Sequence, residues 1–448
     1  MSRPKPLSGF PEFLPAGRMI ENRVLDILRH TFELHGFVNI ETRALEPLDV
    51  LNRKGEITKE VYAVRRLHAD ANAHDELGLH FDLTVPLARY VLENSHALTF
   101  PFRRYQIQKV WRGERPQEGR YREFTQADID IIGENTLADH HDVEAPLVML
   151  EAFERLHDEI GLPKVRMHIN NRKLSEGFYR GLGIEDPTPV LQRVDKYDKI
   201  GPKAVKSLLV EELHLDEKVA DACVALASIH ADDRTFIDQV RTIGVRHEML
   251  DEGLEALAQV LDAANRHVPG RMIADLKIAR GLDYYTGTVY ETELDGYASM
   301  GSICSGGRYD SLASDGKRSY PGVGISMGLS RVLAPIISRG DLLTSRKVPS
   351  CVLIAVDDDD SRLQAMEVAS SLRSRHIPCE VAPKADKYGK QIRYADRRGI
   401  PFVWFGGMDG EVKDIRSGEQ NQADATTWMP DEKDLVVQVY PVTEAQSH

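Results

Sequence analysis

The sequence predicts an α+β protein in which an antiparallel sheet with covering helices precedes a separate C-terminal α/β domain. Two patterns predict this class. Polar and apolar residues alternate along the strand segments of the main part of the chain, which favours antiparallel strands with one accessible face. Strand and helix patterns alternate near the C-terminus, as in a parallel sheet covered by helices. The length of 448 residues agrees, because two or three domains are expected at that size.

The first part of the chain predicts a helix followed by several strands. Apolar side chains recur every three or four residues from Met19 to Phe32, which predicts an amphipathic helix that stops at Gly36. The β-branched and alternating residues from Phe37 to Glu46 predict one strand. Further strands are expected at Tyr105–Arg112, Asp128–Gly133, Ile273–Leu276 and Thr286–Leu294, and a further helix at Asp142–Ile160.

Two regions differ from this main domain. Residues 171–268 are mostly helical in pattern and predict an inserted helical module. Beyond a boundary at Arg339–Pro349, the expected order is strand, helix, strand, helix, strand, at Val352–Val356, Ser361–Arg373, Cys379–Ala382, Lys387–Arg398 and Phe402–Phe405. The predicted domains are therefore 1–170 and 269–338 for the two parts of the main domain, 171–268 for the insertion and 349–441 for the C-terminal domain.

Composition and charge exclude several classes of protein. Lys+Arg 57 and Asp+Glu 70 give a net charge of −13, which argues against indiscriminate nucleic-acid binding but leaves room for a local basic face. The four cysteines form no CxxC pair, so neither a disulfide framework nor a Cys-based zinc site is indicated, and a cytoplasmic location is expected. No apolar run approaches the roughly 18 residues of a membrane span, and no signal-peptide core is present.

Some familiar motifs are absent or misleading. No GxxxxGK[ST] loop occurs, so any use of ATP requires another binding mode. The stretch Gly322–Gly328 resembles a dinucleotide fingerprint, but its third glycine is one position late. His140, His141 and Glu144 stand at helical spacing, yet an exposed polar helix start is the simpler interpretation, and no metal ligand is assigned.

Four clusters concentrate the residues that can carry chemistry. The densest is a hairpin that is expected to bring together Arg112, Glu114, Arg120, Arg122, Phe124 and Gln126. Guanidinium forks suit phosphate and the aromatic ring suits a base, although a surface ion-pair ladder explains the charges about as well. The other clusters are a segment with two adjacent tyrosines, a Gly-Gly turn and a strand leading into a helix, at residues 279–287, 304–310 and 322–331.

These clusters resemble the signatures of class II aminoacyl-tRNA synthetases in the form found in the histidyl-tRNA synthetase family. Trp111–Phe124 (WRGERPQEGRYREF) is similar to motif 2, and Gly328–Arg331 (GLSR) to motif 3. The histidine signatures correspond to Arg280–Tyr285 (RGLDYY) and Ser305–Asp310 (SGGRYD), and the segments Phe81–Arg89 and Lys387–Pro401 fit as well. Two positions depart from the pattern: Arg43 stands where motif 1 usually has Pro, and Ser330 where motif 3 usually has Glu.

The resemblance implies a fold and a reaction. The implied fold is an antiparallel six-stranded class II catalytic sheet flanked by helices, with a helical insertion and a C-terminal α/β anticodon-binding domain. The implied reaction joins L-histidine and ATP into histidyl-adenylate and transfers the histidyl group to tRNA(His), releasing pyrophosphate and AMP. ATP is then a substrate, Mg²⁺ arrives on its phosphates, and a homodimer is expected. A catalytically silent regulatory paralogue, or an enzyme that activates another acid, remains an alternative.

The resemblance also implies roles for individual residues. Arg112 and Arg280 are expected to be catalytic, since fixed guanidinium groups stabilise charge on the α-phosphate. The expected ATP-binding set is Arg112, Glu114, Arg120, Tyr121, Phe124 and Arg331, with adenine between Phe124 and Arg331. The expected histidine-binding set is Asp82, Leu83, Thr84, Arg112, Gln126, Asp130, Arg280, Tyr284 and Tyr285. The expected tRNA-binding set is Arg115 and Gln117 at the acceptor end and Lys387, Lys390, Arg393 and Arg397 on a C-terminal helix.

Overall fold

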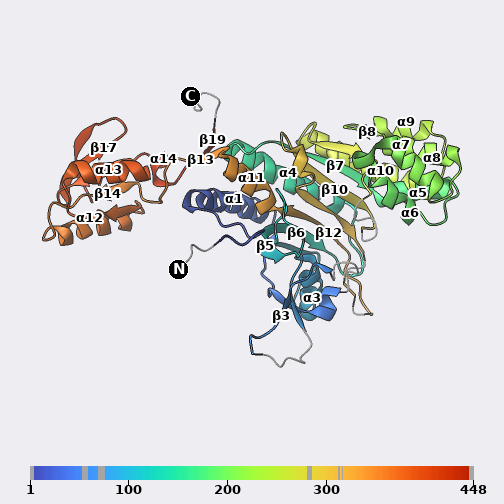
Figure 1. Cartoon of the computed structure of the whole chain (residues 1–448), viewed down its shortest axis with the longest axis horizontal. Coiled ribbons are helices and arrows are strands. Elements are labelled where there is room, and N and C mark those ends of the chain that lie inside the picture. Colours follow the sequence, from blue (N-terminus) through green and yellow to red (C-terminus); the bar gives the residue numbers. More distant parts are fainter. Residues whose placement is uncertain are drawn as a thin grey trace. The chain divides into compact units, whose positions relative to one another are not determined.

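The computed structural model of the chain is shown in Figure 1 and describes residues 5–52, 59–68, 76–279, 285–310, 313–314 and 316–442. The chain divides into two units. The first contains the residues up to Pro11, Ile27–Asp158 and Pro163–Pro335, and the second contains Glu12–Asp26, Glu159–Leu162 and the residues from Ile336 onward. Within the described ranges, none of the helices is both long and apolar enough to cross a membrane.

The first unit is built on a sheet to which the described residues contribute nine strands. In spatial order these are β1 (Val38–Asn39), β5 (Phe102–Trp111), β6 (Glu123–Ile132), β12 (Gly322–Gly328), β11 (Cys304–Tyr309), β10 (Thr288–Leu294), β7 (Val165–Asn171), β9 (Met272–Asp275) and β8 (His230–Ala231). The six strands from β5 to β7 are antiparallel, whereas β1 and β9 join them in parallel. The expected six-stranded antiparallel sheet is therefore inexact, because short strands extend it on both sides into a mixed sheet.

Helices cover this sheet and contact it through specific side chains. Helix α1 (Pro15–Leu34) contacts β5, where the ring centroids of Phe32 and Tyr105 lie 5.7 Å apart and the Tyr105 hydroxyl donates to Glu33 Oε1 at 2.7 Å. Helix α4 (His141–Ile160) is joined to β5 by an ion pair of 2.7 Å between Arg103 and Glu144. The expected first helix and the helix after residue 142 are thus confirmed. Two further helices of this layer are α3 (Thr84–Asn94) and α11 (Leu329–Arg339).

The single strand expected from Phe37 to Glu46 is wrong. The segment forms two short strands in different sheets: β1 in the large sheet and β2 (Leu45–Pro47) in a three-stranded sheet with β4 (Leu77–Leu79) and β3 (Ala63–Val64), followed by α2 (Leu48–Leu51). The segment between β1 and β2 is held by hydrogen bonds from side chains of β5. Gln106 Nε2 donates to Thr42 Oγ1 at 2.9 Å, and Gln108 Nε2 donates to the Thr42 carbonyl at 2.8 Å.

The departure from motif 1 at Arg43 has a structural counterpart nearby. The carboxylate of Glu46 is fully buried and lies 2.8 Å from the guanidinium of Arg89 and 3.1 Å from that of Arg43. A buried carboxylate destabilises the fold unless it is paired and hydrogen-bonded. Arg43 therefore helps to compensate the charge of Glu46, which a proline at that position cannot do.

The insertion consists of helices, two of which approach each other closely at two glycines. Its helices are α5 (Arg172–Gly181), α6 (Thr188–Val194), α7 (Tyr197–Glu211), α8 (Glu217–Ala227), α9 (Thr235–Thr242) and α10 (Glu248–His267). Helices α5 and α10 also pack on β7. A Cβ atom at Gly253 of α10 would lie 2.1 Å from the backbone nitrogen of Leu174, and one at Gly177 of α5 would lie 2.2 Å from that of Leu250. The two backbones therefore touch where neither helix carries a side chain.

Substitution of Gly253 by alanine is expected to destabilise the protein by about 1–3 kcal/mol or more, because overpacking forces rigid backbone apart. Thermal unfolding monitored by circular dichroism measures this effect. Gly389→Ala is the matched control, since no atom lies within 4 Å of a Cβ built there and alanine favours a helix. A Gly253→Ala protein as stable as Gly389→Ala would contradict the close crossing.

The second unit contains the C-terminal α/β domain. Its sheet has the order β15 (Cys379–Val381), β14 (Val352–Ile354), β16 (Phe402–Phe405), β17 (Asp409–Asp414) and β18 (Gln420–Asp424), and the first three strands are parallel. Helices α12 (Arg362–Ser374) and α13 (Tyr388–Arg398) connect these three strands, as expected. The remaining elements are β13 (Leu342–Thr344), α14 (Glu432–Leu435) and β19 (Val439–Pro441). The hairpin β17–β18 was not expected, because its strands are mostly polar.

Candidate active site

Two neighbouring cavities open on the central strands β6, β11 and β12. The outer cavity has a volume of about 290 Å³ and is lined by Arg112, Glu114, Gly119, Arg120, Tyr121, Phe124, Gln126, Ser302, Ile303, Ser305, Ser326, Gly328 and Arg331. The inner cavity has a volume of about 30 Å³ and is lined by Thr84, Asp128, Asp130, Tyr285, Ser305, Tyr309, Gly324, Ile325 and Ser326. Because Ser305 and Ser326 line both, the two cavities meet at these hydroxyl groups.

Strand alternation explains why the polar residues gather here. Side chains two residues apart on a strand share a face, so Gln126, Asp128 and Asp130 of β6 point to the same side of the sheet. Their register partners on β12 are Gly328, Ser326 and Gly324. Small residues on β12 thus leave the space that the longer polar side chains of β6 line.

The guanidinium of Arg112 lies close to two aromatic rings. Its guanidinium carbon lies 4.3 Å from the ring centroid of Phe81 and 5.0 Å from that of Phe124. Its Nη2 also donates to Gln126 Oε1 at 3.4 Å. Burial lowers the pKa of Arg112, while the carboxylates of Asp82 and Glu114 act in the opposite direction. The result is an oriented planar cation in the lining of the outer cavity.

The whole expected ATP-binding set lines the outer cavity. Glu114 lies 4.0 Å from both Arg112 and Arg120, and burial raises the pKa of Tyr121. The cavity also contains Phe124 and Arg331, whose guanidinium donates to the carbonyl of Met300. All six expected residues are therefore brought together. Arg122, which the sequence groups with them, instead donates to the carbonyl of Glu114 at 3.1 Å.

The serine of motif 3 joins two elements beneath this cavity. The hydroxyl of Ser330, at the start of α11, accepts a hydrogen bond of 2.9 Å from the backbone nitrogen of Thr125 in β6. Thr125 is the neighbour of Phe124 and Gln126, both of which line the outer cavity. Ser330 therefore fixes the distance between β6 and the helix that carries Arg331.

The expected histidine-binding residues lie mainly around the inner cavity. Asp130 Oδ2 lies 2.6 Å from Arg104 Nη2, and Asp130 Oδ1 accepts from the Tyr309 hydroxyl at 2.7 Å. Thr84 and Tyr285 line the same cavity, and burial raises the pKa of Tyr285. Gln126 lines the outer cavity and donates to the hydroxyl of Ser326, which lines both cavities, at 2.6 Å. Arg280 and Tyr284 lie outside the described residues.

The segment before helix α3 supplies backbone as well as side chains. Asp82 is buried, and its Oδ1 accepts from the backbone nitrogen of Val85 at 3.0 Å, which caps the helix. Its negative charge is close enough to influence the pKa of Arg112 and of Asp128. The side chain of Leu83 is fully buried. Among these residues, Thr84 lines the inner cavity itself.

Sequence reasoning missed Asp128 as a site residue. Its side chain lines the inner cavity, and its burial, together with the negative charges of Asp130 and Asp82, raises its pKa to about 7, although Arg104 acts in the opposite direction. The spacing Gln126, Asp128, Asp130 on a strand was the available signal, since it places all three residues on one face. The titration of this carboxylate is therefore shifted from the acidic range toward neutral pH.

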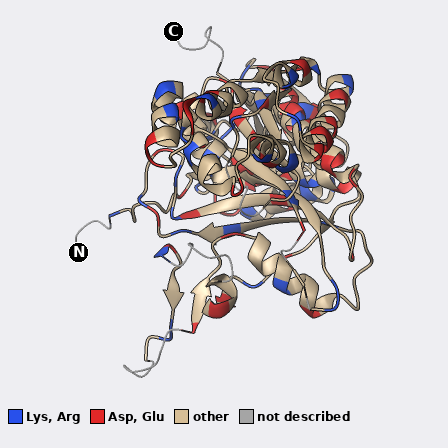
Figure 2. Cartoon of the chain, turned by 90° about the vertical axis from the view of Figure 1, so that its right-hand side faces the viewer, with Lys and Arg blue, Asp and Glu red and all other residues tan. Residues whose placement is uncertain are grey.

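The expected tRNA contacts occupy two separate places. Arg115 and Gln117 are exposed, and Gln117 lines a third cavity of about 420 Å³ that the loop between β5 and β6 shares with β9, β10 and helix α7. Figure 2 faces the insertion and shows acidic and basic positions interspersed over its helices. At the other place, Lys387, Lys390, Arg393 and Arg397 are all exposed at or on helix α13.

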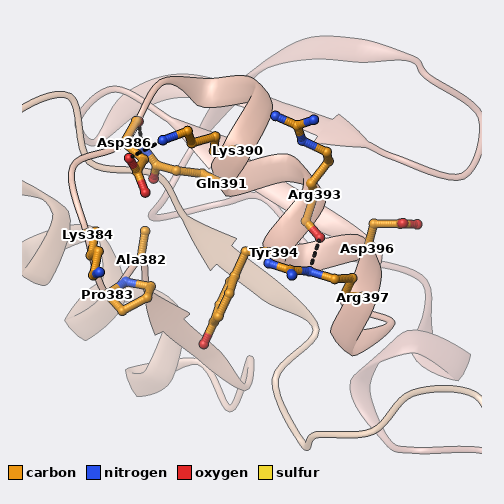
Figure 3. A pocket seen from close by; sticks show the side chains of 10 residues that line it. All are labelled: Ala382, Pro383, Lys384, Asp386, Lys390, Gln391, Arg393, Tyr394, Asp396 and Arg397. Atoms are coloured by element: carbon orange, nitrogen blue, oxygen red, sulfur yellow. Dashed lines mark hydrogen bonds and ion pairs between the residues drawn. The ribbon is translucent and has the colours of Figure 1, made fainter.

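A basic groove runs beside helix α13. It has a volume of about 650 Å³ and is lined by Ala382, Pro383, Lys384, Asp386, Lys390, Gln391, Arg393, Tyr394, Asp396 and Arg397. Figure 3 shows the ring of Tyr394 between the helix and the segment Ala382–Lys384. Lys390 Nζ lies 3.1 Å from Asp386 Oδ1, and Arg397 Nε donates to the Arg393 carbonyl at 3.3 Å. The groove thus combines an aromatic plane with four cationic side chains.

The histidine pair at the start of α4 has a structural explanation. Metal-ligand atoms of His140, His141 and Glu144 lie within 4.8 Å of one another. However, both oxygens of Glu144 accept from Arg103, at 3.0 and 2.7 Å, and Oε2 also lies 2.9 Å from His141 Nδ1. A guanidinium that covers the carboxylate repels a metal cation. The clustering of His140, His141 and Glu144 is therefore explained by the contact between α4 and β5, in which Glu144 binds Arg103.

Comparison with known proteins identifies the family. The family model described as histidyl-tRNA synthetase matches residues 9–332, and that described as anticodon binding domain matches residues 350–424. The histidine–tRNA ligase of Cutibacterium acnes is 69% identical over 97% of this chain and 98% of its own length. That of Micrococcus luteus is 55% identical over 98% of this chain and 99% of its own length.

Solved structures agree with the sequence comparison. The crystal structure of histidyl-tRNA synthetase from Nostoc sp. PCC 7120 has a TM-score of 0.83 and 33% identity, and covers 95% of this chain and 98% of that chain. The outer and inner cavities are lined by residues within 9–332, and the basic groove by residues within 350–424, the ranges that the two family models match. The chain belongs to the histidyl-tRNA synthetase family.

Proposed function

We propose that this chain is a histidine–tRNA ligase that activates L-histidine with ATP and transfers the histidyl group to the 3′ end of tRNA(His). The observation that supports this activity most directly is the junction of two cavities with opposite character. Arginines, an aromatic ring and Glu114 line the outer cavity, whereas two buried carboxylates line the inner one. Such a pair suits a nucleotide and a small amino acid whose ammonium group and ring N–H can donate to carboxylates, respectively.

The outer cavity provides the electrostatics of the first step. A carboxylate oxygen of histidine attacks the α-phosphorus of ATP, the bond to the β-phosphate oxygen breaks, and pyrophosphate leaves. Negative charge on the α-phosphate is stabilised best by donors that are already oriented. We assign this role to Arg112, which its two aromatic neighbours hold in place, and to Arg280. In the second step, a ribose hydroxyl of the terminal adenosine attacks the acyl carbon and AMP leaves.

The inner cavity provides selectivity for histidine. We assign Asp130 and Tyr285 to the imidazole ring, and Asp82, Thr84 and Gln126 to the amino-acid backbone groups. A site built from buried polar groups rejects apolar amino acids, because these would leave the polar groups unpaired.

The remaining assignments follow from the family. Mg²⁺ prefers oxygen ligands and enters with the ATP phosphates. Among the described residues that line the outer cavity, Glu114 is the one carboxylate. We also propose that the chain forms a homodimer and acts in the cytoplasm. Light scattering coupled to size-exclusion chromatography tests the dimer.

Histidine-dependent exchange of pyrophosphate into ATP tests the proposed activity. The purified protein should catalyse the exchange with histidine and Mg²⁺, and no other proteinogenic amino acid should replace histidine. Exchange with a different acid instead would identify another adenylate-forming enzyme. Absence of any exchange would contradict the activity. The same assay therefore distinguishes a histidine-activating enzyme from a protein without activity.

A regulatory paralogue without catalytic activity is the competing function. An ATP phosphoribosyltransferase regulatory subunit/histidyl-tRNA synthetase from Bacillus halodurans C has a TM-score of 0.72 but only 19% identity, which shows a shared fold alone. That structure covers 87% of this chain. The arginine-lined cavity and the anticodon-binding domain favour the ligase, because regulation requires neither.

The groove beside α13 supports the proposed contact with the anticodon end of the tRNA. Lys390→Ala combined with Arg393→Ala should raise the KM for tRNA about tenfold. The salt dependence of this KM should also become shallower, because a protein that contacts fewer phosphates releases fewer counterions when the tRNA binds. The rate of histidine-dependent ATP–pyrophosphate exchange should stay unchanged. Aminoacylation assays over a range of salt concentrations measure both effects.

The control for this prediction removes the same charge elsewhere in the second unit. Lys413→Ala combined with Lys433→Ala changes two lysines outside helix α13, and the Lys433 side chain is 69% exposed. This pair should leave the KM for tRNA within about twofold of the parent value. Equal effects of the two pairs would indicate general electrostatic attraction instead of a defined groove.

A further inference from the structure

Asp128 is a buried carboxylate to which the proposed function assigns no role. It is 2% exposed and lines the inner cavity. Its Oδ1 accepts one long hydrogen bond of 3.3 Å from Gln126 Nε2, and the hydroxyl of Ser326 lies beside it. A carboxylate can accept about four hydrogen bonds. Asp128 therefore keeps acceptor capacity toward the cavity.

Asp130, its neighbour on the same face of β6, is bound differently. One of its oxygens is paired with Arg104 at 2.6 Å and the other accepts from Tyr309 at 2.7 Å. These two partners come from strands β5 and β11, on opposite sides of β6 in the sheet. They hold the carboxylate of Asp130 in one orientation, whereas that of Asp128 retains room for a ligand.

The order of polar groups along β6 matches the order of groups along a histidine molecule. Residues two apart on a strand are spaced by about 6.7 Å. Gln126 lines the outer cavity, where the reacting carboxylate of histidine must meet ATP. Asp130 lines the inner cavity at the other end of this row, the end that suits the imidazole ring. Asp128 also lines the inner cavity and stands between Gln126 and Asp130 along β6, the position in this row that suits the α-ammonium group.

We propose that Asp128, together with Asp82, binds the α-ammonium group of histidine, while Asp130 with its two partners recognises the imidazole ring. This inference rests on the proposed function and assigns one further specificity-determining residue to it. The negative charge of Asp82 acts on Asp128 from the segment before helix α3, so the ammonium group would lie between carboxylates from two elements. A substrate without an ammonium group brings no positive charge to this position.

The charges around Asp128 make binding depend on pH. The carboxyl groups of Asp82 and Asp130 act on it electrostatically, Arg104 faces it from β5, and Arg112 lies close enough to interact with it. Tyr285 is a further titratable neighbour. Burial and the two carboxyl groups raise the pKa of Asp128, so its neutral form prevails below about pH 7. An arriving ammonium group favours the ionised form, and binding then releases a proton.

The test compares two ligands that each lack one group of histidine. Histidinol has the ammonium group and the ring but no carboxylate, and imidazolepropionate has the ring and a carboxylate but no ammonium group. At pH 8, Asp128→Asn should weaken histidinol binding about tenfold or more, since a charged hydrogen bond is lost. It should leave imidazolepropionate within about twofold. Isothermal titration calorimetry measures both affinities without requiring catalysis.

Two results would overturn the assignment. Equal weakening of both ligands would place Asp128 at the imidazole ring, and no weakening of histidinol would remove it from the site. Failure of the proposed function is distinguishable, since it appears as absent histidine-dependent exchange in the unmodified protein. The unmodified protein also provides a test that needs no variant. At pH 6.5, titrations in two buffers of different ionisation enthalpy should show more proton release with histidinol than with imidazolepropionate, and equal release would contradict the proposal.

Discussion

Replacing Arg112 by lysine is expected to lower the rate of histidine-dependent ATP–pyrophosphate exchange by about 1,000-fold. The lysine keeps the positive charge but loses the planar fork. In the parent protein, that plane lies 4.3 Å from the centroid of Phe81 and 5.0 Å from that of Phe124, while Nη2 reaches Gln126. A flexible ammonium group cannot be held in this way, so the charge is no longer oriented when the α-phosphate becomes most negative.

Arg122→Lys is the matched control for this prediction. Arg122 belongs to the same hairpin, but its Nε donates to the carbonyl of Glu114 and the side chain does not line the outer cavity. Its replacement should leave the exchange rate within about threefold of the parent. If Arg112→Lys retained more than a tenth of the parent rate, charge alone would suffice and the aromatic frame would have no catalytic consequence. Equilibrium dialysis with histidine separates lost binding from lost rate.

The long central strands and the C-terminal alternation of strands and helices could be predicted because their patterns are local. Strand β5 extends the expected Tyr105–Arg112 by a few residues toward the N-terminus, and β14, β15 and β16 lie within their expected ranges. The short edge strands could not be predicted in the same way. Strand β1 has two residues, and the segment after it is held by glutamine side chains of β5 that bond to Thr42. Such contacts depend on residues about 65 positions away.

The candidate site was predictable in composition but not in the pairing of its groups. Motif 2 indicates correctly that arginines and an aromatic ring share one cavity, because they lie on one hairpin. It cannot indicate that Arg122 turns to a backbone carbonyl. The distinction between Asp128 and Asp130 is likewise invisible in the sequence, because the partners of Asp130 come from β5 and β11. Tertiary contacts of this kind decide which of two similar carboxylates is available to a ligand.

Substitution of Gly324 by alanine is expected to raise the KM for histidine about 100-fold or more. A Cβ atom at this position of β12 would lie 2.0 Å from Asp130 Oδ1 and 2.6 Å from its Cγ. The carboxylate cannot simply move aside, because Arg104 and Tyr309 hold it from opposite sides. Displacement would break a buried ion pair, which typically costs about 3–5 kcal/mol. Thermal unfolding should therefore show reduced stability as well, and steady-state exchange kinetics measure the KM.

The same substitution at another glycine of β12, Gly328→Ala, is the control. A Cβ atom there would meet Arg331 Cβ at 3.3 Å and would lie beside the outer cavity, so the KM for ATP should change more than that for histidine. Gly324→Ala should show the opposite pattern, since Gly324 lines the inner cavity. Equal effects of Gly324→Ala on both KM values would mean that the strand as a whole has shifted. An unchanged KM for histidine would mean that Asp130 does not contact the substrate, and the imidazole ring would then need a partner other than this carboxylate.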